Sequence, residues 1–326
     1  MHEGLRDVLY GAPGEWTLRR CTGPSCSLLW LDPAPIEADI GAVYATYFTH
    51  QDGEARPTIP KRVFRKIRGS YLRSRLGYKG ANAGGGWRWI APIANLHPGS
   101  SEVFAAFAMF LEAPAPRSVL LDVGAGSGDF MSRMQGLGWE VKGVEPDSVA
   151  ADRGRSRGLQ IHKGDLASAG FGDETFDAIT LAHVIEHVHD PLGLLSLCRR
   201  LLKPHGRVVI LTPNVASWGH RHFGRDWLSL DPPRHLHLFN PENMRRLLQS
   251  ADLLPVRIST LAINASAVWP TSTAIRQARA LSAKSHQPIG LRTTPGGLVR
   301  QFAERLWLGI DGAAGEDLLA IATRAA

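Results

Sequence analysis

The feature that most constrains the fold of this chain is a repeated alternation of apolar runs and helical spacing that begins at Ser118. The run "SVLLDVG" ends in glycines, "DFMSRMQGLG" follows with helical spacing, and "EVKGVEP" is a second apolar run. A strand, a crossover helix and a second strand in this order start a parallel sheet. We therefore expect a βαβ unit from Ser118 onward.

The alternation continues toward the C-terminus. The next expected elements are a helix at 147–157, strands in "LQIHKGD" and "FDAITLAHV", a helix over 191–202, and a strand "GRVVILTPN" opened by the turn "KPHG". A helix then starts with Asn240 as its cap and Pro241 in its first turn, and "PVRISTLAI" and "DLLAIATRA" are the sixth and seventh strands. Apolar runs separated by helices are typical of parallel sheets covered on both faces. The sequence thus predicts an α/β fold with a Rossmann-like, seven-stranded, mostly parallel, doubly wound sheet.

The regions outside this alternation define the expected domain organisation. Residues 1–110 show no regular strand and helix pattern and carry turn-rich stretches, so we expect an accessory N-terminal region. Residues 111–326 then form the sheet domain. Within that domain, residues 268–312 have the character of inserted helices with a Pro/Gly break at "TTPGG".

Composition limits the class of protein. The chain has 326 residues, of which 44% are hydrophobic, enough for a sizeable core. No run of eighteen apolar residues is present, and the N-terminus has no basic start followed by an apolar stretch. Three cysteines are too few for a disulfide framework, which agrees with a reducing compartment. We expect a cytoplasmic protein.

A basic segment lies between Lys61 and Lys79. Eight of its residues are basic and none is acidic, although the net charge of the chain is only +7. A solvated helix face is one interpretation, and contact with an anionic substrate or a membrane surface is the other. Nucleic acid is not expected as a partner because no motif that reads DNA or RNA accompanies the segment.

The turn after the first strand of the alternation contains Gly124, Gly126 and Gly128 and is led by Asp122. Position 129 is an aspartate, so the dinucleotide pattern G-x-G-x-x-G fails. A ligand with an amino group and a carboxylate benefits from both a nearby acid and exposed backbone N–H groups, and S-adenosylmethionine is such a ligand. The glycines let its amino-acid tail approach the backbone.

Two further acids follow at strand ends. Glu145 stands seventeen residues after Gly128, where a carboxylate can accept hydrogen bonds from both hydroxyls of a ribose. Asp165 ends the third strand, where it could bind the exocyclic amine of adenine, with Leu166 against the ring. Each acid alone is as well explained by helix capping, but their order and spacing together favour a nucleoside-type ligand.

These motifs resemble one known family. The matching phrases are "LLDVGAGSGDF", "GVEPD", "KGDL", "FDAITLAHVIEHVHDPLG", "LLKPHGRVVILTPN" and "DPPRHLHLFNPENMRRLL". They resemble class I S-adenosylmethionine-dependent methyltransferases, in the branch that includes ubiquinone-biosynthesis O-methyltransferases and uncharacterised bacterial relatives. The similarity is dense from 118 to about 258, and "EDLLAIATR" fits the family's antiparallel last strand.

The resemblance carries implications for the site. It implies that Asp122 and the three glycines surround the methionine tail, that Glu145 binds the ribose and that Asp165 lies near adenine. It also implies that the 268–312 insertion supplies helices over the acceptor site.

The segment "LAHVIEHVHDP" has the H-x-x-E-H spacing of an inverted zinc protease, with His183, Glu186 and His187. That motif needs a long helix, but here a strand-like run precedes it and Pro191 follows four residues after His187. We therefore do not expect a peptidase. The position is the C-terminal end of the fourth strand, where ligands bind in open α/β sheets, and the resemblance implies that it faces the methyl donor and the acceptor.

The histidines of this segment have three possible roles. His187 or His183 can be a general base for an acceptor hydroxyl, because an imidazole pKa near 6.5 suits that task. Glu186 and His187 can instead ligate a divalent cation, but relatives often carry an acid where His183 stands, so we expect no metal. A purely structural role, capping a helix or binding a carbonyl, is the remaining alternative. We place His183 near the cofactor and Glu186 near the acceptor.

The segment "FGRDWLSLDPPRHLHLFN" follows the fifth strand and holds an aromatic and basic cluster. Loops at this edge often carry binding residues. We expect Trp227 and Arg234 to contact the acceptor, His235 to be a further catalytic candidate, and Asn214 to cap or line the site. Trp227 is equally suited to close the core.

Cys21 and Cys26 precede the phrase "LLWLDPAP". Many relatives carry a zinc ribbon before a similar phrase, made from two CxxC pairs. Two thiolates are too few for a tetrahedral site, so we expect a ribbon remnant without zinc.

The sequence thus predicts a methyltransferase that uses S-adenosyl-L-methionine and a small-molecule acceptor, with a hydroxyl of a secondary metabolite, sugar or lipid-linked precursor as the favoured target. An NAD(P)-dependent oxidoreductase is disfavoured by the missing glycine, and a non-catalytic module that binds a partner through residues 61–79 is the other alternative. Oxygen, nitrogen and carbon acceptors, and the oligomeric state, are left open.

Overall fold

The computed structural model describes residues 1–23, 26–36, 39, 43, 59–79, 100–280 and 294–325. The chain divides into two compact units. The first unit comprises Met1–Phe48, Ala182–Ser196 and Ile210–Thr323, and the second comprises Thr49–Leu181, Leu197–Val209 and Arg324–Ala326. The predicted domain boundary near residue 110 stays a prediction, and the compact units do not follow it.

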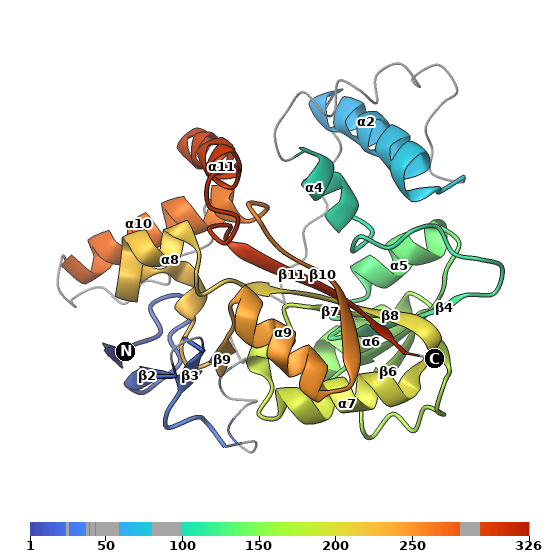
Figure 1. Cartoon of the computed structure of the whole chain (residues 1–326), viewed down its shortest axis with the longest axis horizontal. Coiled ribbons are helices and arrows are strands. Elements are labelled where there is room, and N and C mark those ends of the chain that lie inside the picture. Colours follow the sequence, from blue (N-terminus) through green and yellow to red (C-terminus); the bar gives the residue numbers. More distant parts are fainter. Residues whose placement is uncertain are drawn as a thin grey trace. The chain divides into compact units, whose positions relative to one another are not determined.

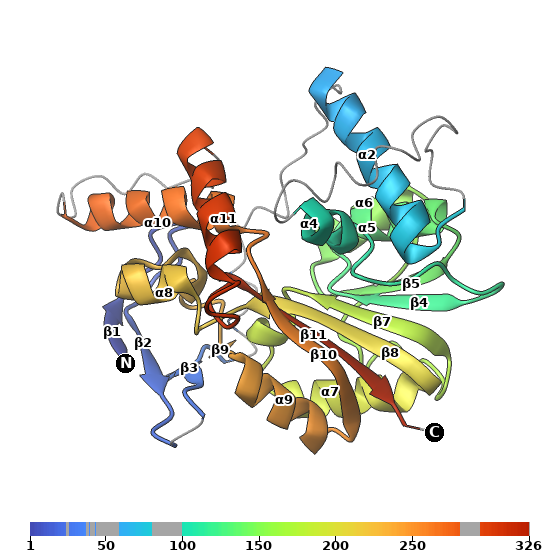
Figure 2. The ribbon, with the colours of Figure 1, turned by 45° about the horizontal axis from the view of Figure 1, so that its top comes forward.

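A seven-stranded sheet has the order β10-β11-β8-β7-β4-β5-β6. Its strands are β4 (Val119–Val123), β5 (Glu140–Glu145), β6 (Gln160–Lys163), β7 (Phe176–Ala182), β8 (Leu202–Pro213), β10 (Leu253–Leu261) and β11 (Asp317–Arg324). The pairings of β4 with β5 and β7, and of β5 with β6, are parallel. The neighbours β10 and β11 run in opposite directions (Figure 2). The predicted fold class, a mostly parallel Rossmann-like sheet with an antiparallel last strand, is confirmed.

The predicted crossover helices are present in the positions expected. They are α5 (Asp129–Gly136), α6 (Ser148–Ser156), α7 (Pro191–Leu201) and α9 (Pro241–Ser250). The packing of α5 on β5 explains Gly143, because a Cβ there would lie 2.6 Å from Met131 Sδ. Asn240 caps α9 as predicted, in a reciprocal capping box with Asn243, and Pro241 occupies the first turn.

The basic segment of the second unit forms the helix α2 (Ile59–Leu76), which packs beside α4 (Ser100–Ala106) (Figure 1). The rings of Phe64 and Phe104 lie 5.0 Å apart. Leu72 is buried, whereas Arg65 and Arg75 are exposed. A solvated basic face is therefore present on α2.

The N-terminal strands belong to a second sheet in the first unit. Its order is β1 (His2–Leu5), β2 (Trp16–Arg20), β3 (Leu29–Leu31) and β9 (His237–Leu238), all paired antiparallel. Leu29 lies opposite Leu238 across the pairing of β3 with β9. The N-terminal region thus supplies three strands of this sheet, and the fourth strand, β9, comes from far along the chain.

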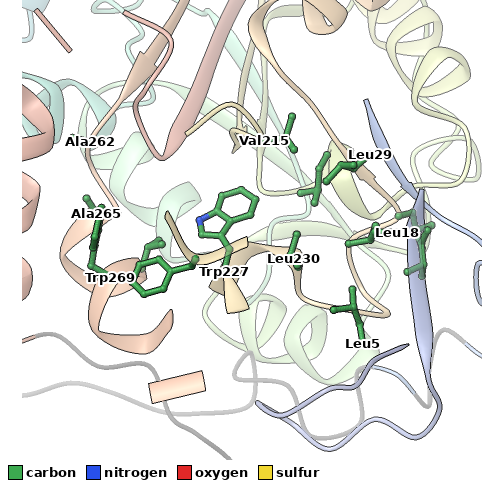
Figure 3. Packing of buried hydrophobic residues seen from close by; sticks show 14 residues of the cluster. Leu5, Leu18, Leu29, Val215, Trp227, Leu230, Ala262, Ala265 and Trp269 are labelled. Atoms are coloured by element: carbon green, nitrogen blue, oxygen red, sulfur yellow. The ribbon is translucent and has the colours of Figure 1, made fainter. Parts of the chain in front are cut away.

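A hydrophobic core fills the first unit (Figure 3). Its labelled members are Leu5, Leu18, Leu29, Val215, Trp227, Leu230, Ala262, Ala265 and Trp269. Side chains from the N-terminal strands, from the segment after β8 and from α10 meet in this core. Trp227 is 2% exposed, so it packs as a core residue.

The predicted helical insertion contains α10 (Ala265–Ala280) and α11 (Pro295–Trp307), and both helices lie in the first unit with α8 (Trp218–Phe223). Thr294 caps α11 by accepting a hydrogen bond from Gly297 N, so the helix begins within the predicted Pro/Gly break. The part of the break before Thr294 lies outside the described residues.

The prediction that the strand begins after the turn "KPHG" was wrong, because β8 already begins at Leu202. The strand is instead kinked at this point. His205 has a φ of 62°, and a Cβ on Gly206 would lie 2.8 Å from Lys203 O. Turn residues inside a strand therefore mark a local distortion here and not its start.

Among the helices of the described residues, none has both the length and the apolar character that a membrane span requires.

Candidate functional site

The glycine turn follows β4 in the second unit. Gly124, Gly126 and Gly128 have φ values of 75°, 52° and 81°, a backbone region that residues with a Cβ rarely adopt. A Cβ on Gly126 would meet nothing within 4 Å, whereas a Cβ on Gly128 would lie 2.1 Å from a methyl carbon of Leu159. Gly128 is thus required for packing, and Gly126 presents bare backbone to open space just before α5.

The carboxylate of Glu145 joins this turn to the end of β5. One oxygen accepts a hydrogen bond from Gly126 N at 2.7 Å, and the other accepts one from Asp147 N at 2.8 Å. Burial raises the pKa of Glu145, and these two N–H donors offset part of that rise. The structure therefore brings Glu145 and the glycine turn into direct contact.

Asp122 is buried beneath the same turn and accepts a hydrogen bond from Thr180 Oγ1 at 2.8 Å. Burial raises its pKa to about 7, against the opposing effect of the Thr180 hydrogen bond, and the nearby charge of Glu145 adds to the rise. A cationic group beside Asp122 would stabilise its ionised form. Such a carboxyl is poised to respond to an ammonium ligand near neutral pH.

The turn after β6 contains the third predicted acid. Gly164 N donates to Glu145 O at 3.0 Å, which ties this turn to the end of β5. Asp165 is exposed, and its Oδ1 accepts a hydrogen bond from Ser168 N at 2.7 Å. Leu166 is buried. The carboxyl ends of β4, β5 and β6 thus bring the predicted cofactor residues of the second unit together.

In the first unit, His183 directly follows β7. It has a φ of 54°, an uncommon conformation for a residue with a side chain, and the side chain is 40% exposed. Its Nδ1 lies 3.2 Å from Oε1 of Glu186, which is completely buried. The other Glu186 oxygen accepts a hydrogen bond from Thr212 Oγ1 at 2.9 Å. A buried carboxylate therefore orients an accessible imidazole.

The pKa values of this pair show the direction of the coupling. Burial would raise the pKa of Glu186, but the hydrogen bond and charge of His183 lower it to about 2. Burial would lower the pKa of His183, but the hydrogen bond and charge of Glu186 raise it above its ordinary value. With Nδ1–H donating to the carboxylate, Nε2 is the atom of His183 that can accept a proton.

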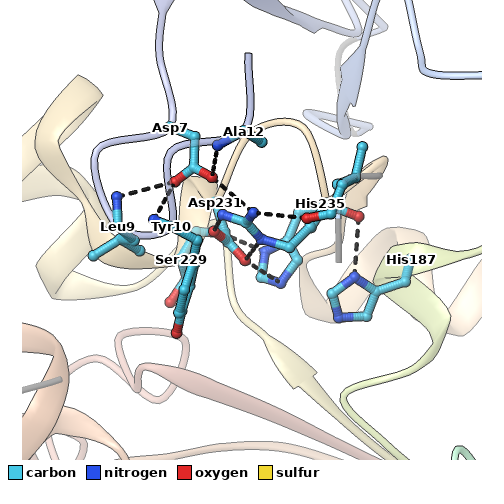
Figure 4. Close-up of polar contacts among 10 residues, drawn as sticks. Asp7, Leu9, Tyr10, Ala12, His187, Ser229, Asp231 and His235 are labelled. Atoms are coloured by element: carbon cyan, nitrogen blue, oxygen red, sulfur yellow. Dashed lines mark hydrogen bonds and ion pairs between the residues drawn. The ribbon is translucent and has the colours of Figure 1, made fainter. Parts of the chain in front are cut away.

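His187 and His235 lie edge to face, with ring centroids 4.7 Å apart (Figure 4). His187 Nδ1 lies 3.0 Å from Arg234 O, and His235 Nδ1 lies 2.8 Å from Ser229 O. Because a carbonyl can only accept, each Nδ1 carries a proton. Burial lowers the pKa of His187 to about 4, with a further contribution from the charge of His235.

Within the part of the chain that the structure describes, Glu186, His187 and His235 each offer a ligand atom within 4.8 Å of the others. Neutral imidazoles with Nδ1–H held by carbonyls are suited to metal ligation. Both Glu186 oxygens, however, already accept hydrogen bonds from other side chains. The expected absence of a metal stays a prediction.

Arg234 has a completely buried side chain that is paired with two carboxylates (Figure 4). Its Nη1 lies 2.8 Å from Asp7 Oδ2, and its Nε lies 3.0 Å from Asp231 Oδ2. Asp7 also accepts backbone hydrogen bonds from Leu9, Tyr10 and Ala12. We therefore replace the predicted acceptor contact of Arg234 by a positioning role: the ion network fixes the loop whose carbonyl orients His187.

Trp227 and Asn214 are also occupied by contacts within the first unit. Trp227 Nε1 donates to Glu316 Oε2 at 2.8 Å. Asn214 is completely buried, and its Nδ2 donates to Ala313 O and Gly315 O, both at 2.7 Å. Trp227 therefore closes the core, and Asn214 binds backbone carbonyls within the unit. Neither side chain is exposed to an acceptor.

The sequence reasoning missed several residues of the site. Thr180 and Thr212, on β7 and β8, hold the two buried carboxylates Asp122 and Glu186. Asp231 has a local signal, since it stands three residues before Arg234 in "DPPR". Asp7 has none, because 227 residues separate it from Arg234.

The chain is similar to several known proteins. Residues 97–257 match the family model "Methyltransferase domain". The "Ubiquinone biosynthesis O-methyltransferase" of Cereibacter sphaeroides strain ATCC 17025 is 34% identical over 174 residues, which cover 48% of this chain and 69% of the relative. The protein of the same description from strain ATCC 17029 is 33% identical over 53% of this chain and 76% of the relative. A solved methyltransferase structure from Archaeoglobus fulgidus aligns over 72% of this chain and 99% of its own, at 20% identity and a TM-score of 0.48.

A mostly parallel α/β sheet with a glycine turn and carboxylates at its strand ends is typical of nucleotide-binding enzymes. The similarity to the Cereibacter proteins makes the family specific: this chain belongs to the S-adenosylmethionine-dependent methyltransferases. Its predicted enzyme class and cofactor are thereby confirmed, and the oxidoreductase and the non-catalytic module are set aside.

The buried ion network generates a stability prediction. Asp7→Asn should lower the free energy of unfolding by about 1.5–3 kcal/mol, because it removes a charged hydrogen bond from a guanidinium that remains buried. Denaturant unfolding measures the change. The matched control is Asp32→Asn, which breaks the exposed pair with Arg19 and should cost less than about 1 kcal/mol. Equal losses in the two variants would contradict the role given to Asp7.

Proposed function

We propose that this methyltransferase transfers a methyl group to a hydroxyl of a small-molecule acceptor, such as a secondary metabolite, a sugar or a lipid-linked precursor. The observation that carries the proposal is the pair of His183 and Glu186, an accessible imidazole oriented by a buried carboxylate. This is the arrangement of a general base for a weakly acidic hydroxyl. The description of the relatives as O-methyltransferases supports the same choice of acceptor atom.

In this proposal the second unit holds the cofactor. Asp122 pairs with the ammonium of its methionine part, and the backbone of the Gly124, Gly126 and Gly128 turn lies against that part. The open space at Gly126 fits such an approach. Glu145 accepts hydrogen bonds from the ribose hydroxyls, since each carboxylate oxygen has a second lone pair beyond its backbone donor.

The adenine contacts and the chemistry of the cofactor complete this part of the proposal. Asp165 binds the exocyclic amine, and the apolar side chain of Leu166 flanks the ring. The bound cofactor supplies an activated methyl group on a positively charged sulfur. We propose that His183 also contacts the cofactor.

The first unit supplies the groups that handle the acceptor. Nε2 of His183 takes the hydroxyl proton, and Glu186 stabilises the imidazolium that forms. His187 and His235 have their Nδ1–H groups held by carbonyls, so Nε2 of each ring is the atom that we assign to the acceptor hydroxyl. Arg234 and Asp231 hold the loop that carries His235. Orientation of acceptor and methyl in line accounts for most of the rate, worth about 7–11 kcal/mol.

The predictions about other partners and about location are kept as proposals. The basic face of α2 is proposed as a contact surface for an anionic substrate or a membrane, nucleic acid is not proposed as a partner, and the location is proposed to be cytoplasmic.

The pH dependence of binding tests the role of Asp122. Burial raises its pKa to about 7, and only the ionised form pairs with an ammonium, so binding below that pH must first remove a proton. The affinity for S-adenosylhomocysteine should rise about tenfold between pH 6 and pH 8 and then level off, as measured by calorimetry. Asp122→Asn should bind more weakly and with a flat profile. A wild-type slope that persists in this variant would remove Asp122 from the cofactor site.

The substitution His183→Asn tests the general base. Transfer of labelled methyl groups into the small-molecule fraction of a host-cell extract should fall by about 10²–10⁴-fold, whereas S-adenosylhomocysteine affinity should fall by far less than the rate. In the wild-type protein the rate should rise with pH through a pKa above the ordinary 6.5 of histidine, since Glu186 favours the imidazolium. The variant should lose this dependence.

The matched control is His205→Asn, because His205 also has a positive φ but lies in the second unit on β8. It should transfer at the wild-type rate. A His183→Asn protein that is equally active would exclude the proposed base.

Removal of divalent cations tests the prediction of a metal-independent reaction. Dialysis against EDTA should leave methyl transfer unchanged, because His183 and Thr212 already occupy the Glu186 oxygens. If the rate falls and Mg²⁺ or Zn²⁺ restores it, then Glu186, His187 and His235 form a metal site, and His235→Gln should then abolish the restoration.

A further inference from the structure

The helix α11 has an exposed apolar stripe. Val299 is 67% exposed, and Ile310, three residues beyond the end of the helix, is 77% exposed. Leu298, Phe302, Leu306 and Trp307 are exposed apolar residues of the same segment. Their spacing of three and four residues places most of them on one helix face. We call this set the α11 stripe.

The opposite face of α11 is the one that anchors the helix. Gly297 approaches α10 so closely that a Cβ would lie 2.2 Å from Ser266 O. Glu304 is completely buried, accepts a hydrogen bond from Trp269 Nε1 at 3.1 Å and accepts another from Glu316 N at 2.8 Å. Figure 1 shows α11 beside α10, in agreement with these contacts. Within the α11 stripe, Trp307 stacks on Trp218 with ring centroids 5.9 Å apart. The rest of the stripe is not the face that anchors the helix.

The charges of the insertion are almost all of one sign. Residues 265–310 contain six basic residues and a single acidic one, the buried Glu304. Arg300 is exposed on α11, with its guanidinium 5.1 Å from the ring centroid of Trp269. Asp311, the next acid along the chain, is paired with Arg221 at 2.7 Å. Arg276 and Arg279 of α10 are paired with Asp226, so the basic residues beside the stripe are Arg300 and Arg305 of α11 itself among the described residues.

We propose that the α11 stripe docks on the surface of a lipid bilayer that contains anionic headgroups. A helix with exposed Leu, Phe and Trp and with basic residues beside them is suited to lie in the interfacial plane, where apolar side chains enter the acyl boundary and cations meet headgroups. Trp307 has the amphipathic ring that favours this depth. A second copy of the chain fits less well, because a two-fold contact through the stripe would bring the basic residues of the two copies together.

Vesicle co-sedimentation of the full chain tests the proposal. The wild-type protein should bind vesicles in which about a third of the phosphatidylcholine is replaced by phosphatidylglycerol, and bind pure phosphatidylcholine far less. Leu306→Glu with Ile310→Glu should weaken binding to the anionic vesicles at least about tenfold. The assay measures binding and not methyl transfer, so its outcome is independent of the acceptor.

Two variants control for general effects of surface charge. Leu254→Glu with Val256→Glu adds the same charge at exposed apolar positions of β10 and should bind as the wild type does. Arg65→Glu with Arg75→Glu reverses two charges on the basic face of α2 and tests whether that face binds the vesicles instead of the α11 stripe. Circular dichroism and S-adenosylhomocysteine affinity confirm that each variant is folded.

Several outcomes would overturn the proposal. One is that the wild-type protein fails to bind anionic vesicles. Another is that the α11 and β10 variants lose binding equally. A third is that the α2 variant loses binding while the α11 variant retains it. Sedimentation velocity adds one more: self-association of the wild type that only the α11 variant abolishes would assign the stripe to a second copy.

Discussion

The buried carboxylate of Glu186 is the interaction on which the candidate acceptor site depends. An ionised carboxylate without partners is too costly to bury, so its surroundings are organised around it. His183 and Thr212 take one oxygen each, and the backbone oxygen of Glu186 accepts a hydrogen bond from Leu236 N at 2.7 Å. One residue thereby connects the end of β7, the end of β8 and the loop before β9.

The second unit repeats this principle with different geometry. Glu145 and Asp122 are buried acids at the ends of neighbouring strands, and backbone N–H groups or a hydroxyl satisfy them. Their pKa values are both raised, whereas that of Glu186 is lowered. The difference arises because the partners of Glu145 and Asp122 are neutral, whereas Glu186 has an imidazole that becomes cationic. Acids of the first kind are suited to receive a cation, and an acid of the second kind is suited to support a base.

Local patterns explain what the sequence could predict. The glycine turn, the capping box at Asn240 and the strands from β4 to β7 depend on residues close together in the chain, so their signals are readable. The carboxylates at strand ends follow, because parallel strands place their carboxyl ends at one edge. The start of β8 was predicted wrongly because turn residues such as those around His205 can also distort a strand from within.

Long-range partners explain what the sequence could not predict. Arg234 was assigned to the acceptor because loops at this edge of the sheet often carry binding residues, and its partner Asp7 is too distant in sequence to be associated with it. The pairing of β3 with β9 was missed for the same reason, since β9 has only two residues and no strand pattern of its own. The apolar residues of α11 have helical spacing in the sequence, but this spacing alone does not show which face of the helix is buried.

The pairing of β3 with β9 limits how this enzyme can have been assembled or can be shortened. The family-matched segment starts at residue 97, after all three N-terminal strands and after Asp7. A chain reduced to that segment would expose the edge of β9, leave hydrophobic side chains of the first core uncovered and deprive the Arg234 guanidinium of one of its two carboxylates. The loop that carries His235 would then lose one of the two carboxylates that hold Arg234. The three strands and Asp7 that precede the matched segment are therefore part of the same fold unit as β9 and Arg234.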